Sequence, residues 1–503
     1  MTDEPEQPAD GEGRSAALAG GPPGEVGDAT PRRTRIVVAT EDVAAAKMAG
    51  PAIRAWNLAD SLSHEHDVVL ATPQPCDLTH PRFRLVNEVE TDFRETLEWC
   101  DVLVFQGWTM WNRPYVVESD KVMVVDIYDP MHLEQLEQAK DHGPAARQAA
   151  IEATTAVLNQ QLARGDFFFC ASETQRTFWL GQLAALGRIN AAVYDADPTL
   201  RSFLDVVPFG LEPEIPAHSA PAMRGAIDGI GPDDKVVLWG GGVYNWFDPL
   251  TLVRAVDRLK ERVPEVRLVF MGMTHPNPGI PKMRMAHETV QLSDELGLTG
   301  KHVFFNDTWV ALDERHNFLL ESDVAVATHF DGLETDFAFR TRILDCMWSS
   351  LPVVATEGGA LSDLVAERGL GTTVPSEDVD ALVDALERHL VDAEFNEACR
   401  ERMRAVREEY RWDVVARPLL EFCRDPHRAP DLLDPELTAA MDRLRGLGQA
   451  ASAELDRPFR RGVYRKVAVA ARMADDHGMW FTVRHFGRSL WTSVTTRWER
   501  TFG

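Results

Sequence analysis

A short stretch in the second half of the chain brings acidic and basic side chains together: Glu334, Arg340, Arg342 and Asp345. The stretch has the pattern of a strand end, an acidic loop and the start of a helix. A helix N-terminus offers free backbone N–H groups and the positive end of the helix dipole, and arginine can bind a phosphate through two parallel hydrogen bonds. The stretch is therefore typical of a phosphate-binding site.

Two consecutive glycines, Gly358 and Gly359, follow the next apolar run along the chain. Glycine has no Cβ, so a turn of this kind lets the backbone approach the same anion closely. Asp345, farther along the preceding helix, is suited to hold ribose hydroxyls. In the alternative interpretation the charges form a surface ion-pair network and the glycines only cap a turn, since structural ion pairs are common. Their shared position at the carboxyl ends of two adjacent strands favours a site.

Alternating strands and helices position these residues. Short continuous apolar runs are typical of strands buried on both faces, and helical patterns between them predict parallel sheets. The expected strands of the first half are residues 35–40, 67–71, 102–105, 122–126, 166–170 and 206–210. Those of the second half are residues 235–239, 266–271, 303–305, 324–327 and 352–355. We expect two Rossmann-like, doubly wound α/β domains at 34–215 and 232–410, facing each other across a cleft where ligands bind.

The chain has 503 residues, of which 45% are hydrophobic, and a formal net charge of −27. This composition is that of a globular protein of two or three domains, and the negative charge argues against general nucleic-acid binding. Six cysteines scattered singly, with no CxxC pair, favour a reducing cytosol and indicate no metal site. Residues 1–33 are expected to form a disordered tail without a signal peptide, and no stretch approaches the ~20 apolar residues of a membrane span.

The end of the chain differs in character from the rest. Residues 457–503 carry ten basic and three acidic side chains, with aromatic residues interleaved. One interpretation is a helix that lies on an anionic membrane surface, with tryptophan at the interface and arginine at the headgroups. The other is a helical appendage that packs its aromatic side chains against the preceding domains or against a second copy. We therefore expect residues 428–503 to form a helical, basic and aromatic extension.

Residues 344–365 resemble the donor-site signature of family 4 glycosyltransferases, which reads roughly L-E-A-M-A-C-G-x-P-V-V-A-T-x-x-G-G-x-x-E-x-V. The resemblance extends more weakly over about residues 35–425. It implies the GT-B fold, with a nucleotide-sugar bound between two Rossmann-like domains, and retaining sugar transfer without a metal or other cofactor. It also implies a helix that crosses back to the first domain, at residues 411–427.

The resemblance assigns roles to residues at matching positions. Asp345 takes the place of the second glutamate of the family motif, which holds the nucleotide ribose. Gly50, in the loop after the first strand, matches the glycine that lets the donor phosphate approach, and Trp309 with Val310 matches the segment whose backbone contacts the base. The turn whose amides meet the diphosphate corresponds to Gly358, Gly359, Ala360 and Leu361.

Two features of the family pattern are missing. The first motif glutamate belongs at the position of Phe337, so Glu334 or Asp336 would have to reach the transferred sugar from a remodelled loop. The basic pair that follows the first strand of the second domain is also absent, since residues 240–248 contain no lysine or arginine. Arg340 and Arg342 are the candidates to neutralise the diphosphate in its place.

On the side of the first domain, His132 and Asp129 follow an expected strand and should face the cleft. Either could hold the acceptor hydroxyl or the sugar, although a single histidine after a strand is often only a hydrogen-bonded structural residue. In retaining transfer the leaving phosphate can itself take the acceptor proton, so the family pattern requires no strong side-chain base.

These observations favour a cytoplasmic glycosyltransferase, associated with the inner face of the cell membrane, that moves a sugar from a nucleoside-diphosphate sugar to a glycan or lipid-linked acceptor. The resemblance implies a setting in cell-envelope polysaccharide synthesis. Arg340 and Arg342 would stabilise the leaving diphosphate, and Glu334 would hold the transferred sugar. Two alternatives stay open. One is a nucleotide-sugar epimerase of the same fold, which would use water as its acceptor. The other is a non-catalytic GT-B partner of an active transferase, docked at the inner face of the membrane through residues 457–503.

Overall fold

The computed structural model describes residues 32–74, 76, 78–275 and 282–441. The expected tail at 1–33, apart from its last two residues, lies outside this range, as do residues 442–503 of the expected extension. No helix among the described residues is both long and apolar enough to cross a membrane.

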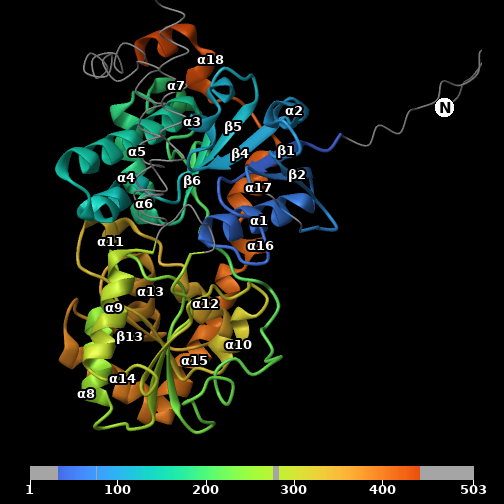
Figure 1. The fold of residues 1–503 in the computed structure, drawn as a ribbon. Helices are drawn as coiled ribbons and strands as arrows, with labels where there is room; N and C mark the ends of the chain where they lie inside the picture. The colour runs from blue at the N-terminus through green and yellow to red at the C-terminus, as the bar shows by residue number, and fades with distance from the viewer. Residues whose placement is uncertain (1–31, 75, 77, 276–281, 442–503) are drawn as a thin grey trace, which may run out of the picture. The chain divides into compact units, whose positions relative to one another are not determined.

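Two parallel sheets form the framework of the described chain (Figure 1). The first has the order β3-β2-β1-β4-β5-β6-β7 and the second the order β10-β9-β8-β11-β12-β13, so in each the strand order reverses beside the first strand. The strands of the first sheet are β1 (Arg35–Ala39), β2 (Asp67–Thr72), β3 (Arg84–Asn87), β4 (Val102–Gln106), β5 (Val122–Asp126), β6 (Phe167–Cys170) and β7 (Leu204–Val206). Those of the second are β8 (Lys235–Trp239), β9 (Val266–Phe270), β10 (Val303–Phe305), β11 (Val324–Ala327), β12 (Val353–Thr356) and β13 (Gly371–Val374). This is the doubly wound topology that the apolar runs predict, and ligands of such sheets bind where the order reverses.

Helices cover both faces of each sheet. The helices of the first half are α1 (Gly50–Ser63), α2 (Phe93–Trp99), α3 (Thr109–Asn112), α4 (Met131–Gln138), α5 (Pro144–Arg164), α6 (Glu173–Ala185) and α7 (Ala191–Ala196). Those of the second half are α8 (Pro249–Leu259), α9 (Arg284–Glu295), α10 (Arg315–Leu320), α11 (Leu333–Phe337), α12 (Arg342–Ser349), α13 (Ala360–Arg368), α14 (Val379–Val391) and α15 (Ala393–Arg407). The final helices are α16 (Trp412–Val415), α17 (Arg417–Arg424) and α18 (Pro430–Leu433).

Alternate residues of each strand enter different cores, because successive side chains of a strand point to opposite faces. In β1, Ile36 and Val38 pack with α1 and α17, whereas Val37 and Ala39 pack with α5 and α6 (Figure 1). The second sheet divides in the same way, with α8, α9 and α14 on one face and α12, α13 and α15 on the other. Because helices cover both faces of each sheet, successive residues of a central strand must be mostly apolar.

The chain returns to the first sheet after α15. Leu211 accepts a hydrogen bond from the backbone N–H of Trp412, and a Cβ on Gly210 would lie 2.5 Å from the Trp412 ring, so only glycine fits there. Farther along, Arg188 pairs with Asp431 at 2.6 Å, with both side chains fully buried. The segment expected as one crossing helix consists of two short helices, α16 and α17, because Pro418 in the first turn of α17 has no N–H to continue the preceding helix.

Most expected strands agree with the structure to within one residue, but three differ more: β3 and β13 are not among the expected strands, and β7 begins and ends earlier than expected. β3 and β13 carry no continuous apolar run because each lies at the edge of its sheet and is only half-buried. The strand expected at 206–210 is β7, which ends at Val206, because Pro208 cannot donate a hydrogen bond to the sheet.

Candidate functional site

Arg342 extends from the first residue of α12 to the turn that follows β8. Its Nη2 donates to the carbonyl of Gly242 at 2.9 Å, and the guanidinium lies 3.9 Å from the ring centre of Phe247 and 4.8 Å from that of Trp239. Burial, together with the nearby charge of Arg340, lowers the pKa of Arg342 to about 9. The side chain is still a cation at neutral pH, held where an approaching anion would compensate for its lost hydration.

Arg340 lies beside it in an ion pair with Glu334. The two carboxylate oxygens accept from Nη1 at 3.0 Å and from Nη2 at 2.6 Å, and only 7% of the Arg340 side chain and 10% of the Glu334 side chain are exposed. The Arg340 guanidinium is 5.0 Å from the ring centre of Phe247, so both arginines contact one aromatic ring. Within the described part of the chain, Arg340 Nε and Arg342 Nη1 are buried without a hydrogen-bond partner. Two buried cations thus keep donor capacity for an anion.

The Gly358–Gly359 turn packs against the loop that carries Glu334. Both glycines have positive φ, +94° and +84°, and a Cβ on Gly359 would lie 2.9 Å from the carbonyl oxygen of Thr335. The Thr335 hydroxyl donates to the carbonyl of Phe330 at 2.8 Å and accepts from Arg340 at 3.3 Å. The turn and the arginine pair are therefore one packed unit. Ala360 and Leu361 are the first two residues of α13.

Asp345 lies one turn into α12 and faces α10. Its carboxylate is 3.4 Å from Arg315 Nη2, and 32% of its side chain is exposed. Burial raises the pKa of Asp345, and the charges of Arg315 and Arg342 oppose that rise. The carboxylate is thus accessible beside α10, and the ribose contact expected for it stays a prediction.

Trp309 follows β10 and contacts the loop before α1. Its indole Nε1 donates to the carbonyl of Met48 at 3.1 Å, and Val310 is the next residue along the same loop. Gly50 begins α1, and a Cβ placed on it would have no atom within 4 Å among the described residues. The expected base and phosphate positions therefore lie on two loops that contact each other.

A small, shallow hollow lies beside Trp309 at the carboxyl ends of β8, β9 and β10. Its lining is mainly apolar and aromatic: Gly242, Val243, Tyr244, Met273, His275, Lys282, Met283 and Trp309. Trp309 and His275 have ring centres 5.4 Å apart. A flat, aromatic ligand group matches such walls.

His132 and Phe337 both lie at an aromatic cluster. The centre of the His132 ring is 5.5 Å from that of Phe178 and 6.0 Å from that of Trp179. Burial lowers the pKa of His132 to about 4. The ring centres of Phe337 and Phe178 are 4.6 Å apart, and the Phe337 carbonyl accepts a hydrogen bond from Gln175 Nε2 at 2.8 Å. The residue at the position of the missing glutamate therefore links the loop around α11 to α6, and His132 is neutral at pH 7.

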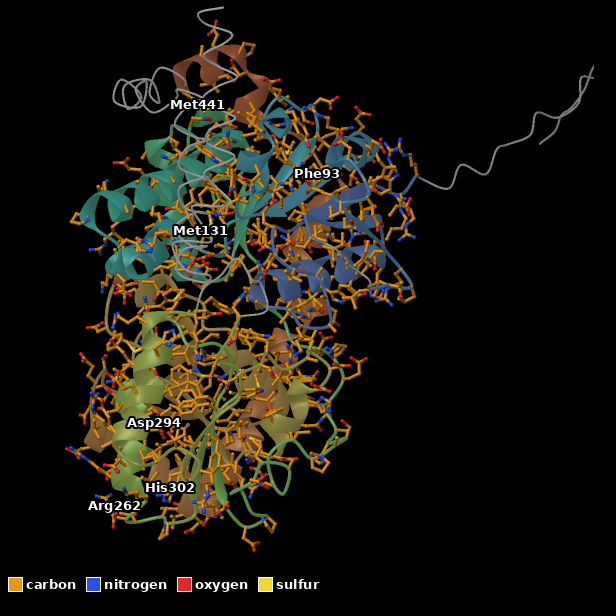
Figure 2. All side chains as sticks on the ribbon, in the orientation of Figure 1. Phe93, Met131, Arg262, Asp294, His302 and Met441 are labelled. Atoms are coloured by element: carbon orange, nitrogen blue, oxygen red, sulfur yellow. The ribbon has the colours of Figure 1, made fainter. Side chains whose placement is uncertain are left out.

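Glu134 is a candidate residue that the sequence analysis did not single out. It lies in the first turn of α4, which begins at Met131 (Figure 2), and its carboxyl group is hydrogen-bonded to that of Asp129. The charges of Glu334 and Arg340 act on both groups. In the sequence, Glu134 stands out only as an acidic residue in the first turn of a helix that follows a strand. Acidic residues are common at this position, so the pattern does not identify a site.

The structure thus gathers Glu334, Arg340 and Arg342 around Phe247 and the glycine turn, with Asp129 and Glu134 next to them. Asp345 and Trp309 lie on neighbouring loops of the second sheet, whereas Gly50 and His132 belong to the first. Charged groups, backbone turns and aromatic rings thus gather at the carboxyl ends of parallel strands, which is the usual position of ligand sites in doubly wound sheets.

Solved structures show the same fold. Sucrose-phosphate synthase from Thermosynechococcus elongatus is 16% identical, with a TM-score of 0.56 over 78% of this chain and 98% of its own. HepE from Anabaena, solved in complex with UDP-glucose, is 13% identical, with a TM-score of 0.54 over 78% and 99%. These similarities establish the GT-B fold for the described chain.

Residues 234–392 match the family described as "Glycosyl transferases group 1", so this segment is similar to a domain of that family. A D-inositol 3-phosphate glycosyltransferase from Nocardioides sp. is 27% identical over 241 residues, which are 46% of this chain and 50% of the relative. The chain therefore spans about half the length of this curated relative. The low identity agrees with a divergent branch of the glycosyltransferases.

Proposed function

We propose that this protein transfers a sugar from a nucleoside-diphosphate sugar to a glycan or lipid-linked acceptor, with retention of configuration. The observation that carries the proposal is the position of Arg342. It places a desolvated cation at the turn after β8, where the family pattern has its basic pair, although Arg342 itself comes from α12. A diphosphate that leaves a sugar gains negative charge, and a prepositioned cation in a water-poor site stabilises that charge.

The neighbouring groups support a complete donor site. Arg340 adds a second cation beside Phe247, and the glycine turn packs against the loop that carries Glu334. Glu334, already oriented by Arg340, can accept hydroxyl hydrogens of the transferred sugar. The hollow beside Trp309 would take the base, and Asp345 the ribose.

Calorimetry with nucleoside diphosphates and nucleotide-sugars tests the proposal. Wild-type protein should bind at least one of them with micromolar affinity, and Arg342→Ala should weaken binding by about 10- to 100-fold, because a charged hydrogen bond contributes about 1.5–3 kcal/mol. Arg262→Ala is the matched control. The Arg262 side chain is 51% exposed on the surface (Figure 2), where it pairs with Asp384 and Glu387, so its removal should leave affinity unchanged.

Absence of binding by the folded wild-type protein would refute the donor site. Conversion of a bound nucleotide-sugar to its epimer without an acceptor would instead indicate the epimerase. Binding without any turnover would favour the non-catalytic partner. The setting we propose is assembly of cell-envelope polysaccharide, with residues 457–503, which lie outside the described range, against an anionic membrane surface.

A further inference from the structure

Two carboxyl groups of the first domain form a hydrogen-bonded pair beside the candidate donor site. Asp129 precedes α4, whose start is fixed by a hydrogen bond from the Met131 N–H to the Asp129 carbonyl at 2.8 Å. Glu134 lies in the first turn of that helix, and its side chain reaches back to the Asp129 carboxyl group. Both residues are half-buried.

Groups from three other elements surround this pair. Glu334 on α11 and Arg340 after it act on both carboxyl groups, and Asp126 at the end of β5 acts on Asp129. Asp126 is itself held by Arg54 at 2.6 Å and 3.0 Å, which leaves it bound in the core. Arg340 is nine-tenths buried, and its Nε has no hydrogen-bond partner in the described chain. A buried donor without a partner indicates that a polar ligand binds in this cluster, and the carboxyl pair lies next to it.

The surroundings favour a proton shared by the two carboxyl groups. Burial raises the pKa of Asp129 to about 6 and the pKa of Glu134 well above its ordinary value. Two adjacent carboxyl groups do not both ionise readily, so they titrate as a unit. Glu134 then carries the proton and donates it in a hydrogen bond to the Asp129 carboxylate, which keeps lone pairs to accept another hydrogen.

We propose that Asp129 is the base that accepts the proton of the acceptor hydroxyl and that Glu134 is its positioning residue; this rests on the proposed function. The acceptor oxygen forms a bond to the anomeric carbon while the bond from that carbon to the phosphate oxygen breaks. The electron pair of the broken bond stays on the diphosphate, the acceptor proton moves to Asp129, and solvent later removes it.

The position of the base agrees with retention. Asp129 lies beside Arg340, one of the two cations proposed to hold the leaving diphosphate. The acceptor therefore loses its proton on the side from which the diphosphate departs. Entry and departure on one face of the sugar keep its configuration.

The test uses the full chain and the nucleotide-sugar that calorimetry selects, with water and azide as the two acceptors. Water must lose a proton in the transfer, whereas the azide anion needs no base. Asp129→Asn should slow nucleotide release with water about 100-fold, the usual contribution of a general base, and leave donor affinity within twofold. Azide should restore the rate of Asp129→Asn and yield a glycosyl azide, but it should not rescue Arg342→Ala.

The pH profile tests Glu134 separately. Its hydrogen bond lowers the pKa of Asp129, so Glu134→Ala should move the acid limb of kcat to higher pH, whereas Glu134→Gln, which still donates, should leave it in place. Glu137→Ala is the control, since Glu137 lies three residues after Glu134 on α4 and pairs with Lys140, which follows the helix.

Two outcomes would overturn the proposal. The first is an Asp129→Asn rate within threefold of wild type, and the second is failure of azide to restore that variant. A wild-type protein that binds no donor, or that binds the donor without any turnover, would refute the proposed function itself, so the two failures are distinguishable.

Discussion

The indole of Trp309 donates a hydrogen bond to the carbonyl of Met48 at 3.1 Å and so joins the loop after β10 to the loop before α1. A second link runs from the Leu312 N–H to the carbonyl of Ala46, also at 3.1 Å. Trp309 contributes its ring to the aromatic hollow at the same time. One side chain thus serves both a contact between loops of the two sheets and the wall of the proposed base site.

Replacement of Trp309 should separate these two roles. Trp309→Ala should weaken binding of the nucleoside diphosphate that calorimetry selects by about 10- to 100-fold, because stacking of a base on an aromatic side chain contributes about 1–3 kcal/mol. Trp309→Phe keeps an aromatic ring but loses the N–H donor, so its effect should be smaller. Calorimetry with inorganic pyrophosphate supplies the control, since this ligand has no base and its affinity should not change. Equal weakening of both ligands would contradict a base-stacking role.

Gly359 should tolerate no side chain. Its φ of +84° is rare for other residues, and a Cβ would lie 2.9 Å from the carbonyl oxygen of Thr335. Gly359→Ala should therefore lower the free energy of unfolding by about 1–3 kcal/mol and weaken donor binding. Gly181→Ala is the control, because Gly181 is exposed within α6 and a Cβ added there would have no described atom within 4 Å, so alanine should stabilise that helix by up to about 1 kcal/mol. Urea denaturation measures both, and an unchanged Gly359→Ala would refute the close packing.

The sequence predicts the buried strands well and the edge strands poorly, for a physical reason. β4 and β5 are covered on both faces and so consist of continuous apolar residues, a pattern visible without any structure. β13, with two threonines at the sheet edge, is half-buried and needs no such run. A break such as that between α16 and α17 depends on one proline rather than on periodicity.

In the candidate site, too, the sequence predicts contacts between nearby residues better than contacts between distant ones. The charges of Glu334 and Arg340 are six positions apart, and a short loop brings them together. Arg342 and Gly242 are 100 positions apart, and only the topology of the second sheet makes them neighbours. The proximity of Glu134 to Arg340 depends in turn on contacts between α4 and the loop of the other sheet. The types of residue indicate which chemistry is possible. Contacts between residues distant in the sequence decide which of these groups lie together in one site.

His389 should make the stability of the protein depend on pH. It is buried at the end of α14 beside Thr372, and burial lowers its pKa from 6.5 to about 4. Between these values the unfolded chain binds a proton that the folded chain does not, so the free energy of unfolding falls as the pH decreases, by about 1.4 kcal/mol per pH unit for one histidine. Above pH 6.5 this contribution is fully present.

His389→Leu removes the group that binds this proton. The substitution should therefore reduce the slope of the free energy of unfolding against pH. Between pH 6 and pH 5, the free energy of unfolding of His389→Leu, measured by urea denaturation, should fall less steeply than that of wild type by about 1.4 kcal/mol per pH unit. The lost hydrogen bond to Thr372 lowers stability equally at every pH and does not affect the slope. His287→Gln, on the exposed face of α9, should keep the wild-type slope. Parallel curves for wild type and His389→Leu would show that His389 is protonated in the folded protein, and burial would then not control its charge.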